Sequence, residues 1–159
     1  MNSPKYSRRF RTKHQSLTRT PTEKLVVFQV GNEHFAIPIE RVQRVLKEFT
    51  PHGTLGSGRS LVRHQNETIT LIDVSALFLA GSASSDSNYL IVCPLNRGDR
   101  LGIPIAEMPT ILDVPLDQLS EIPELYRQGK LAPAVEKLIH SADGKAVFYL
   151  NLDKLVNLL

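Results

Sequence analysis

The sequence contains no tryptophan, only one cysteine and no long apolar run. Cys93 cannot form a disulfide within the chain, and its place in an apolar segment predicts a buried thiol in a reducing compartment. Runs such as residues 25–28 and 89–92 are far shorter than the roughly 20 residues that cross a bilayer, and no apolar segment follows the basic N-terminus as in a signal peptide. The sequence therefore predicts a cytoplasmic protein.

The titratable residues form no motif for catalysis or metal binding. The five histidines lack the His-x-x-x-His spacing, and a single cysteine cannot build a thiolate cluster. The glycines of residues 53–58 lack the order of the dinucleotide fingerprint, and Asp73 is explained equally well as the cap of the segment that follows it. We therefore expect no catalytic residue, metal or cofactor; a hydrolase or transferase would need a cluster of perturbed titratable groups in a pocket.

Positive charge is concentrated at the N-terminus. Residues 1–24 carry seven Lys and Arg against one Glu, a net charge of +6, so that the remainder carries −3. Low apolar content and absent periodicity predict that residues 1–23 form a disordered basic arm. The arm is compatible with binding to nucleic acid or an anionic surface, with a transit peptide, or with a solvated tail that binds nothing. Its candidate binding residues are Arg8, Arg9, Arg11, Lys13 and Arg19.

The rest of the chain contains an internal duplication. Residues 35–46 align with residues 101–112, both copies contain Ile-Pro-Ile, and apolar positions match throughout. Residues 72–78 likewise align with residues 150–156. A stretch rich in Ser, Ala and Gly at residues 80–88 separates the copies and is typical of a linker. The sequence thus predicts two similar subdomains, about 24–80 and about 89–159.

Each copy has the pattern of a β-rich unit. Phe35, Ile37 and Ile39 alternate with polar or small residues, which is the period of a half-buried strand. The spacing of residues 42–46 indicates a helical turn or a kink before the strand continues to Phe49. Asp143-Gly144 predicts a hairpin that pairs residues 135–140 with residues 146–150, although a helix over 134–139 remains an alternative. Since each half is too small for a large core, we expect two antiparallel barrels that pack together.

The order of these segments resembles the CheW family over about residues 24–158. The resemblance rests on residues 25–31 leading to 35–39 and 42–43, and on residues 69–74, 101–104 and 143–155. It implies a mainly β fold of two SH3-like five-stranded barrels that share a hydrophobic core, with short helices at their ends. It also implies a non-enzymatic adaptor, peripheral to membrane receptor arrays, that couples methyl-accepting chemoreceptors to the regulatory domain of a CheA-type histidine kinase in a taxis or pilus-type motility system.

The same resemblance implies two partner-binding surfaces. The first surface is Ile39, Val42, Gln43, Arg44 and Val45, and the second surface is Arg63, His64, Gln65 and Asn66. The family usually has Glu where this chain has Arg44, and Arg where it has Gln65, which predicts a specialised partner set. Core packing of the two valines and a solvated turn are the alternatives. Self-association, or binding to other CheW-like domains, is also compatible with the duplication.

Overall fold

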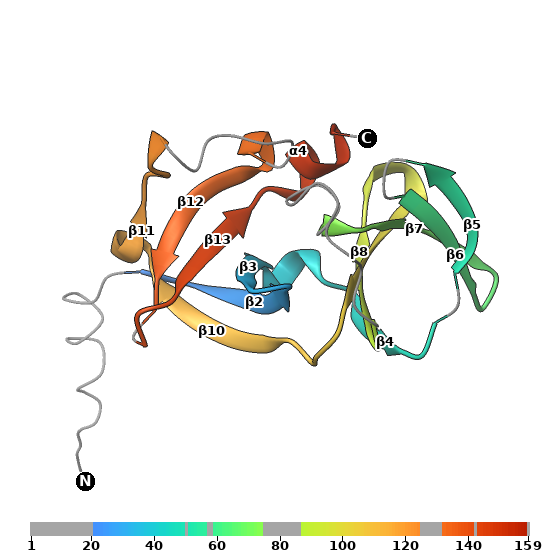
Figure 1. Ribbon diagram of the computed structural model, residues 1–159, viewed down its shortest axis with the longest axis horizontal. Coiled ribbons are helices and arrows are strands. Elements are labelled where there is room, and N and C mark those ends of the chain that lie inside the picture. Colours follow the sequence, from blue (N-terminus) through green and yellow to red (C-terminus); the bar gives the residue numbers. More distant parts are fainter. Residues whose placement is uncertain are drawn as a thin grey trace, which may run out of the picture.

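The computed structural model describes residues 21–49, 51–56, 59–74, 87–124, 132–141 and 143–158, with only the backbone described for 51–56 and 59 (Figure 1). Most of the predicted arm, residues 1–20, and most of the predicted linker, residues 80–86, lie outside these ranges. The ordered body begins slightly before the expected boundary, because Thr22 and Glu23 already belong to strand β2. Glu23 accepts a hydrogen bond from the Tyr149 hydroxyl at 3.1 Å, which ties this end of the strand to the body.

The described chain is mainly β, as predicted, and forms two curled, barrel-like sheets (Figure 1). In spatial order the first sheet contains β10 (Thr110–Pro115), β2 (Thr22–Val30), β3 (Glu33–Pro38), β13 (Ala146–Leu150), β12 (Val135–His140) and β11 (Leu119–Ser120). The second contains β4 (Arg44–Lys47), β8 (Tyr89–Pro94), β9 (Arg100–Ile105), β7 (Glu67–Ile72), β6 (Arg59–His64) and β5 (Pro51–Gly56). In the described part of the chain each sheet has six strands, where the resemblance implies five-stranded barrels.

The short helical elements lie between and after the strands. They are η1 (Ile39–Arg41), η2 (Asn96–Gly98), η3 (Leu116–Gln118), η5 (Ala132–Ala134) and α4 (Leu152–Val156). The α4 helix lies near the junction of the two sheets (Figure 1). Asn151 caps it by accepting a hydrogen bond from the backbone N–H of Lys154 at 3.0 Å, which is the role expected at this position of the repeat.

The duplication is visible in the strand order. Strands β2, β3 and β13 occupy the places in the first sheet that β8, β9 and β7 occupy in the second, and each sheet contains one parallel pair, β3 with β13 or β9 with β7. The first hairpin of each copy is exchanged, however: β2 and β3 join β10–β13, while β8 and β9 join β4–β7. The predicted boundary at residues 80–88 therefore does not separate the two sheets.

The exchange occurs where the chain leaves each Ile-Pro-Ile strand. After β3, the η1 turn leads into β4 of the second sheet, and after β9 residues 106–109 lead into β10 of the first. The predicted kink is therefore a 3₁₀ turn, but it lies at Ile39–Arg41 and not within residues 42–46. The next strand ends at Lys47, before Phe49. The predicted hairpin of β12 and β13 is confirmed, with Leu138 opposite Phe148, and the alternative helix over 134–139 is wrong.

Side chains on the two faces of the inner strands enter different cores. In β2, Leu25 packs with Ala36 and Val114 inside the first sheet, whereas its neighbour Val26 joins a larger core between the sheets. In β8, Leu90 and Val92 likewise pack inside the second sheet. Such strands are apolar on both faces because both are buried. The larger core contains residues of both sheets and Leu152 and Leu155 of α4, which confirms the predicted shared core.

Cys93 is buried in this shared core and has no disulfide partner. Burial raises the pKa of its thiol from the ordinary 9.0 to about 12, although the charge of Arg41 acts in the opposite direction. The thiol therefore stays protonated when folded, so its contribution to stability is complete below about pH 9 and declines as the pH rises toward 12.

We expect the folded chain to react with a thiol reagent such as DTNB about a thousandfold more slowly at pH 8 than the urea-unfolded chain, because a pKa of about 12 leaves so little thiolate. The absorbance of the released product gives both rates. Equal rates for the folded and unfolded chains would contradict the buried position.

Candidate partner-binding surface

The first surface begins in η1 and continues into the edge of the second sheet. Ile39 lies in η1, Val42 and Gln43 follow it, and Arg44 and Val45 open β4, which is the outermost strand of that sheet among the described residues. The three apolar side chains are half-buried and pack against the shared core. Core packing therefore accounts for their inner sides, and their outer sides are left at the surface.

The second surface is the turn between β6 and β7. Gln65 and Asn66 have φ angles of 49° and 68°, as in a two-residue hairpin loop whose central residues are both left-handed. Gln65, Asn66 and Arg63 are exposed, and His64 is half-buried. The predicted turn is thus present, and its side chains are accessible.

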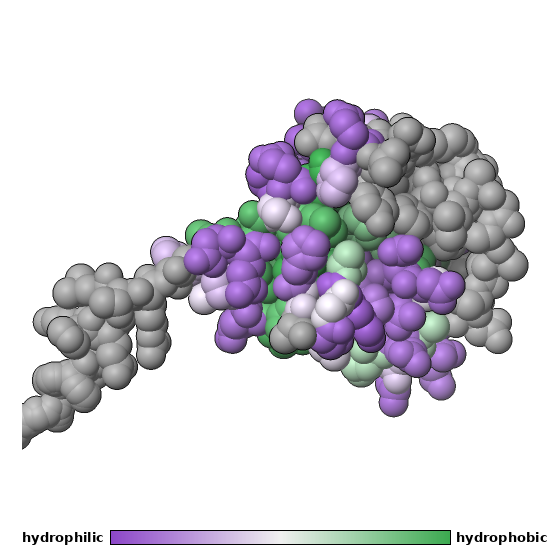
Figure 2. Space-filling model, turned by 60° about the vertical axis from the view of Figure 1, so that its left-hand side comes forward, coloured by the Kyte–Doolittle hydropathy of each residue, from purple (hydrophilic) through white to green (hydrophobic). Residues whose placement is uncertain are grey.

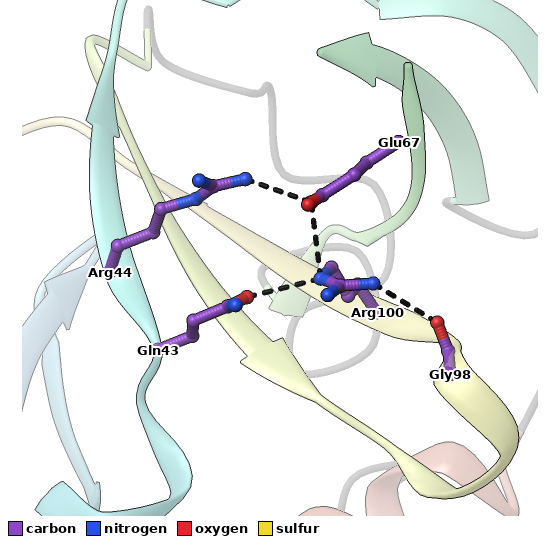
Figure 3. Close-up of polar contacts among 5 residues, drawn as sticks. All are labelled: Gln43, Arg44, Glu67, Gly98 and Arg100. Atoms are coloured by element: carbon purple, nitrogen blue, oxygen red, sulfur yellow. Dashed lines mark hydrogen bonds and ion pairs between the residues drawn. The ribbon is translucent and has the colours of Figure 1, made fainter. Parts of the chain in front are cut away.

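A polar cluster joins the first surface to Glu67, the residue directly after the second surface (Figure 3). Glu67, the first residue of β7, accepts a hydrogen bond from Nη2 of Arg44 through its Oε2 atom at 2.8 Å. The same Oε2 lies 3.1 Å from Nε of Arg100, the first residue of β9. Nε of Arg100 also donates to Oε1 of Gln43 at 3.1 Å, and its Nη1 donates to the carbonyl of Gly98. We call Gln43, Arg44, Glu67 and Arg100 the arginine cluster.

Charge within the arginine cluster is unbalanced, because two guanidinium groups share one carboxylate. The side chains are only about a third exposed, at 32% for Arg44, 30% for Glu67 and 26% for Arg100, so water screens their interaction less than at a fully exposed site. Nε of Arg44 is buried and has no hydrogen-bond partner in the part of the chain that the structure describes. The cluster therefore has a surplus positive charge and an unused donor.

Sequence reasoning found Gln43 and Arg44 through the family resemblance but missed Glu67 and Arg100. Arg44 and Glu67 are 23 positions apart, and Gln43 and Arg100 are 57 apart. No local pattern joins positions so distant. The one signal available was that Glu67 directly follows the predicted turn and is the nearest carboxylate to it.

A second feature missed by sequence reasoning is a group of exposed apolar side chains in and beside β10 of the other sheet, which we call the β10 patch. It consists of Met108, Ile111, Leu112 and Leu116, which are exposed by 55%, 61%, 37% and 44%. Strand β10 is the outermost strand of the first sheet among the described residues. Figure 2, which turns this side of the molecule forward, shows apolar surface between polar side chains. The duplication pairs Ile111 with Val45, so equivalent positions are exposed in one copy and half-buried in the other.

Two further ion pairs lie beside β12 of the first sheet. Around a hollow of about 580 Å³ beside β12, Lys137 pairs with Glu121 at 2.9 Å and Lys154 with Glu136 at 3.3 Å. Within the described ranges, no three His, Cys, Asp or Glu side chains gather as a possible metal site.

No helix in the described part of the chain is long and apolar enough to span a membrane.

Comparison with known proteins identifies the family. The model of the CheW-like domain matches residues 24–159. The chain belongs to the CheW family. Its fold is similar to the crystal structure of the scaffolding protein TtCheW from Thermoanaerobacter tengcongensis, with a TM-score of 0.69 and 18% sequence identity over 82% of this chain and 90% of that chain. A search of curated proteins found no match.

Membership in the CheW family gives the structure a general role. CheW proteins are scaffolds of chemotaxis signal transduction and are not enzymes. The match covers every described element except the first two residues of β2, which begins at Thr22. The features that matter for a scaffold are surfaces, and this domain has the arginine cluster on one sheet and the β10 patch on the other.

Proposed function

We propose that the chain is a cytoplasmic adaptor that couples methyl-accepting chemoreceptors to the regulatory domain of a CheA-type histidine kinase, in a taxis or pilus-type motility system. The observation that carries the proposal is the hydrogen bond from Arg44 of the first surface to Glu67, the residue directly after the second surface. This bond brings the strand that follows the second surface next to the first surface. The family's scaffolding role supports the same reading.

The structure of this region suits the binding of a partner protein and requires no catalytic group. Ile39, Val42 and Val45 are held by the shared core, so little conformational entropy remains to be lost when a partner covers them. Strand β4 beside them is a sheet edge, and such edges accept contacts from another β-rich domain. The kinase regulatory domain, which in this family has the same fold, is a suitable partner for that edge.

Coupling also requires that two partners be held at once. The β10 patch belongs to the other sheet and is an apolar edge of the kind found in protein interfaces. With one surface on each sheet, the rigid shared core fixes the relative position of two bound proteins. Individually modest contacts then gain strength through repetition in an array.

The proposal is tested by titrating the full chain with the kinase regulatory domain and with a receptor cytoplasmic fragment from the same organism, using isothermal titration calorimetry. We expect wild type to bind the kinase domain, and the double variant Val42→Asp/Val45→Asp to bind it at least tenfold more weakly, because two carboxylates would be desolvated in the interface. Circular dichroism and a urea titration check that the variant is folded.

The matched control is Val135→Asp, a half-buried valine that packs against the same core from β12 of the first sheet. It should retain wild-type affinity if folded. No binding by wild type to either protein would contradict the proposed function. Binding to anionic vesicles or nucleic acid, abolished by changing Arg8, Arg9, Arg11, Lys13 and Arg19 to Gln, would instead favour a role for the basic arm.

A further inference from the structure

The two arginines of the arginine cluster differ in the number of acceptors that their side chains contact. Arg100 donates through Nε to Gln43 and through Nη1 to the Gly98 carbonyl, and it also pairs with Glu67. Within the described residues, the Arg44 side chain makes a single hydrogen bond, to Glu67, although a guanidinium has five N–H donors. Its buried Nε has no acceptor among the described residues. Arg44 is therefore the member with the largest unused capacity to bind a carboxylate.

The surroundings of Arg44 add further positive charge. The end of β6 contributes exposed Arg63, opposite Thr68, and the β8–β9 turn contributes exposed Arg97 together with exposed Asp99. Together with the arginine cluster, the described residues of these strand ends and turns contain four arginines and two carboxylates, Glu67 and Asp99. A surface with this balance attracts acidic groups of a partner and repels basic ones.

Arg44 lies where an approaching partner domain can reach its guanidinium group. Arg44 is the first residue of β4, the sheet edge, and its side chain is about a third exposed beside the first surface. A domain that approaches β4 can place an acidic side chain against the guanidinium. A carboxylate can take two parallel hydrogen bonds from the planar guanidinium fork, whereas only one is observed to Glu67.

We propose that Arg44 binds a carboxylate of the kinase regulatory domain, and that Glu67 occupies the place of that carboxylate in the free protein. The inference rests on the proposed function, since it names the chemistry of that partner. Glu67 then acts as an internal competitor: it keeps Arg44 paired when no partner is bound, and it weakens the complex because it must share or give up the guanidinium.

The two residues are therefore expected to have opposite effects on binding. In the full chain, Arg44→Gln should weaken binding of the kinase regulatory domain about tenfold or more. Glu67→Gln should tighten binding several-fold and steepen its dependence on salt, because the surplus charge becomes available to the partner. Glutamine at position 67 can still accept the hydrogen bond from Arg44, which limits structural disturbance. Calorimetric titrations at two ionic strengths give the affinities.

Glu121→Gln and Lys137→Gln are the charge-matched controls, because that ion pair of 2.9 Å lies on the first sheet. Both should leave affinity unchanged. If the bridge between Arg44 and Glu67 were only structural, both Arg44→Gln and Glu67→Gln would weaken binding. That result, or any in which Glu67→Gln does not tighten the complex, overturns this inference but leaves the proposed function standing. No binding by wild type overturns the proposed function, and the inference with it.

Discussion

Phe35→Ala is expected to lower the free energy of unfolding by about 3 to 5 kcal/mol, the loss typical of a large aromatic side chain removed from a core. Phe35 is fully buried in β3, and its ring lies 5.9 Å from that of Phe28 and 5.8 Å from that of Phe148. The three residues are opposite one another on adjacent strands. They connect the exchanged hairpin of the first copy to a strand of the second.

Urea denaturation followed by circular dichroism measures this effect. Because domains are stable by only about 5 to 15 kcal/mol, the alanine variant can lose most of its folded population, so Phe35→Leu is measured beside it. Leucine keeps much of the apolar volume and should cost about 1 to 2 kcal/mol. If the alanine variant lost less than about 1 kcal/mol, the central role of the three rings would be refuted.

Gly102→Val is expected to destabilise the protein by about 3 kcal/mol or more, because the core of the second sheet has no room for a side chain there. A Cβ atom at Gly102 would lie 2.8 Å from a methyl carbon of Leu71 and 2.9 Å from methyl carbons of Ile69 and Leu90. Three contacts this short cannot all be relieved by one side-chain movement in a close-packed interior.

The control for Gly102→Val is Thr68→Val, which places the same β-branched side chain at an exposed position of β7. It should change stability by no more than about 0.5 kcal/mol. Chemical denaturation of both variants tests the comparison. A Gly102→Val protein as stable as wild type would mean that the second sheet has free volume at its centre.

Position 102 also shows what the duplication encodes. Its counterpart in the first copy is Ala36, which is fully buried in the small core inside the first sheet. Both copies thus have a small residue where the strand faces the inside of its own narrow sheet, and large residues such as Phe35 and Leu101 where it faces the shared core. The sequence contained this alternation, but the two apolar faces could be distinguished only in three dimensions.

The candidate site was predictable only in part. Family resemblance pointed to Arg44 and to the turn at Gln65, and the structure places both near Glu67. Arg100 was not predictable, because its contact with Gln43 depends on how β9 lies beside β8, and β8 beside β4. The β10 patch was missed for a similar reason: Ile111 and Val45 look alike in sequence, and only the packing of each edge strand decides which one is exposed.

The sequence by itself determined the mainly β fold, the duplication, the β12–β13 hairpin and the buried thiol of Cys93. These features depend on local alternation, turn residues and composition, which can be read along the chain. Tertiary structure decided which hairpin joins which sheet and which carboxylate balances Arg44. The alternation of apolar residues determines which faces of a strand are buried. Equivalent strands of the two copies have the same alternation, so it cannot determine which sheet a hairpin joins. Only long-range packing decides between the two sheets.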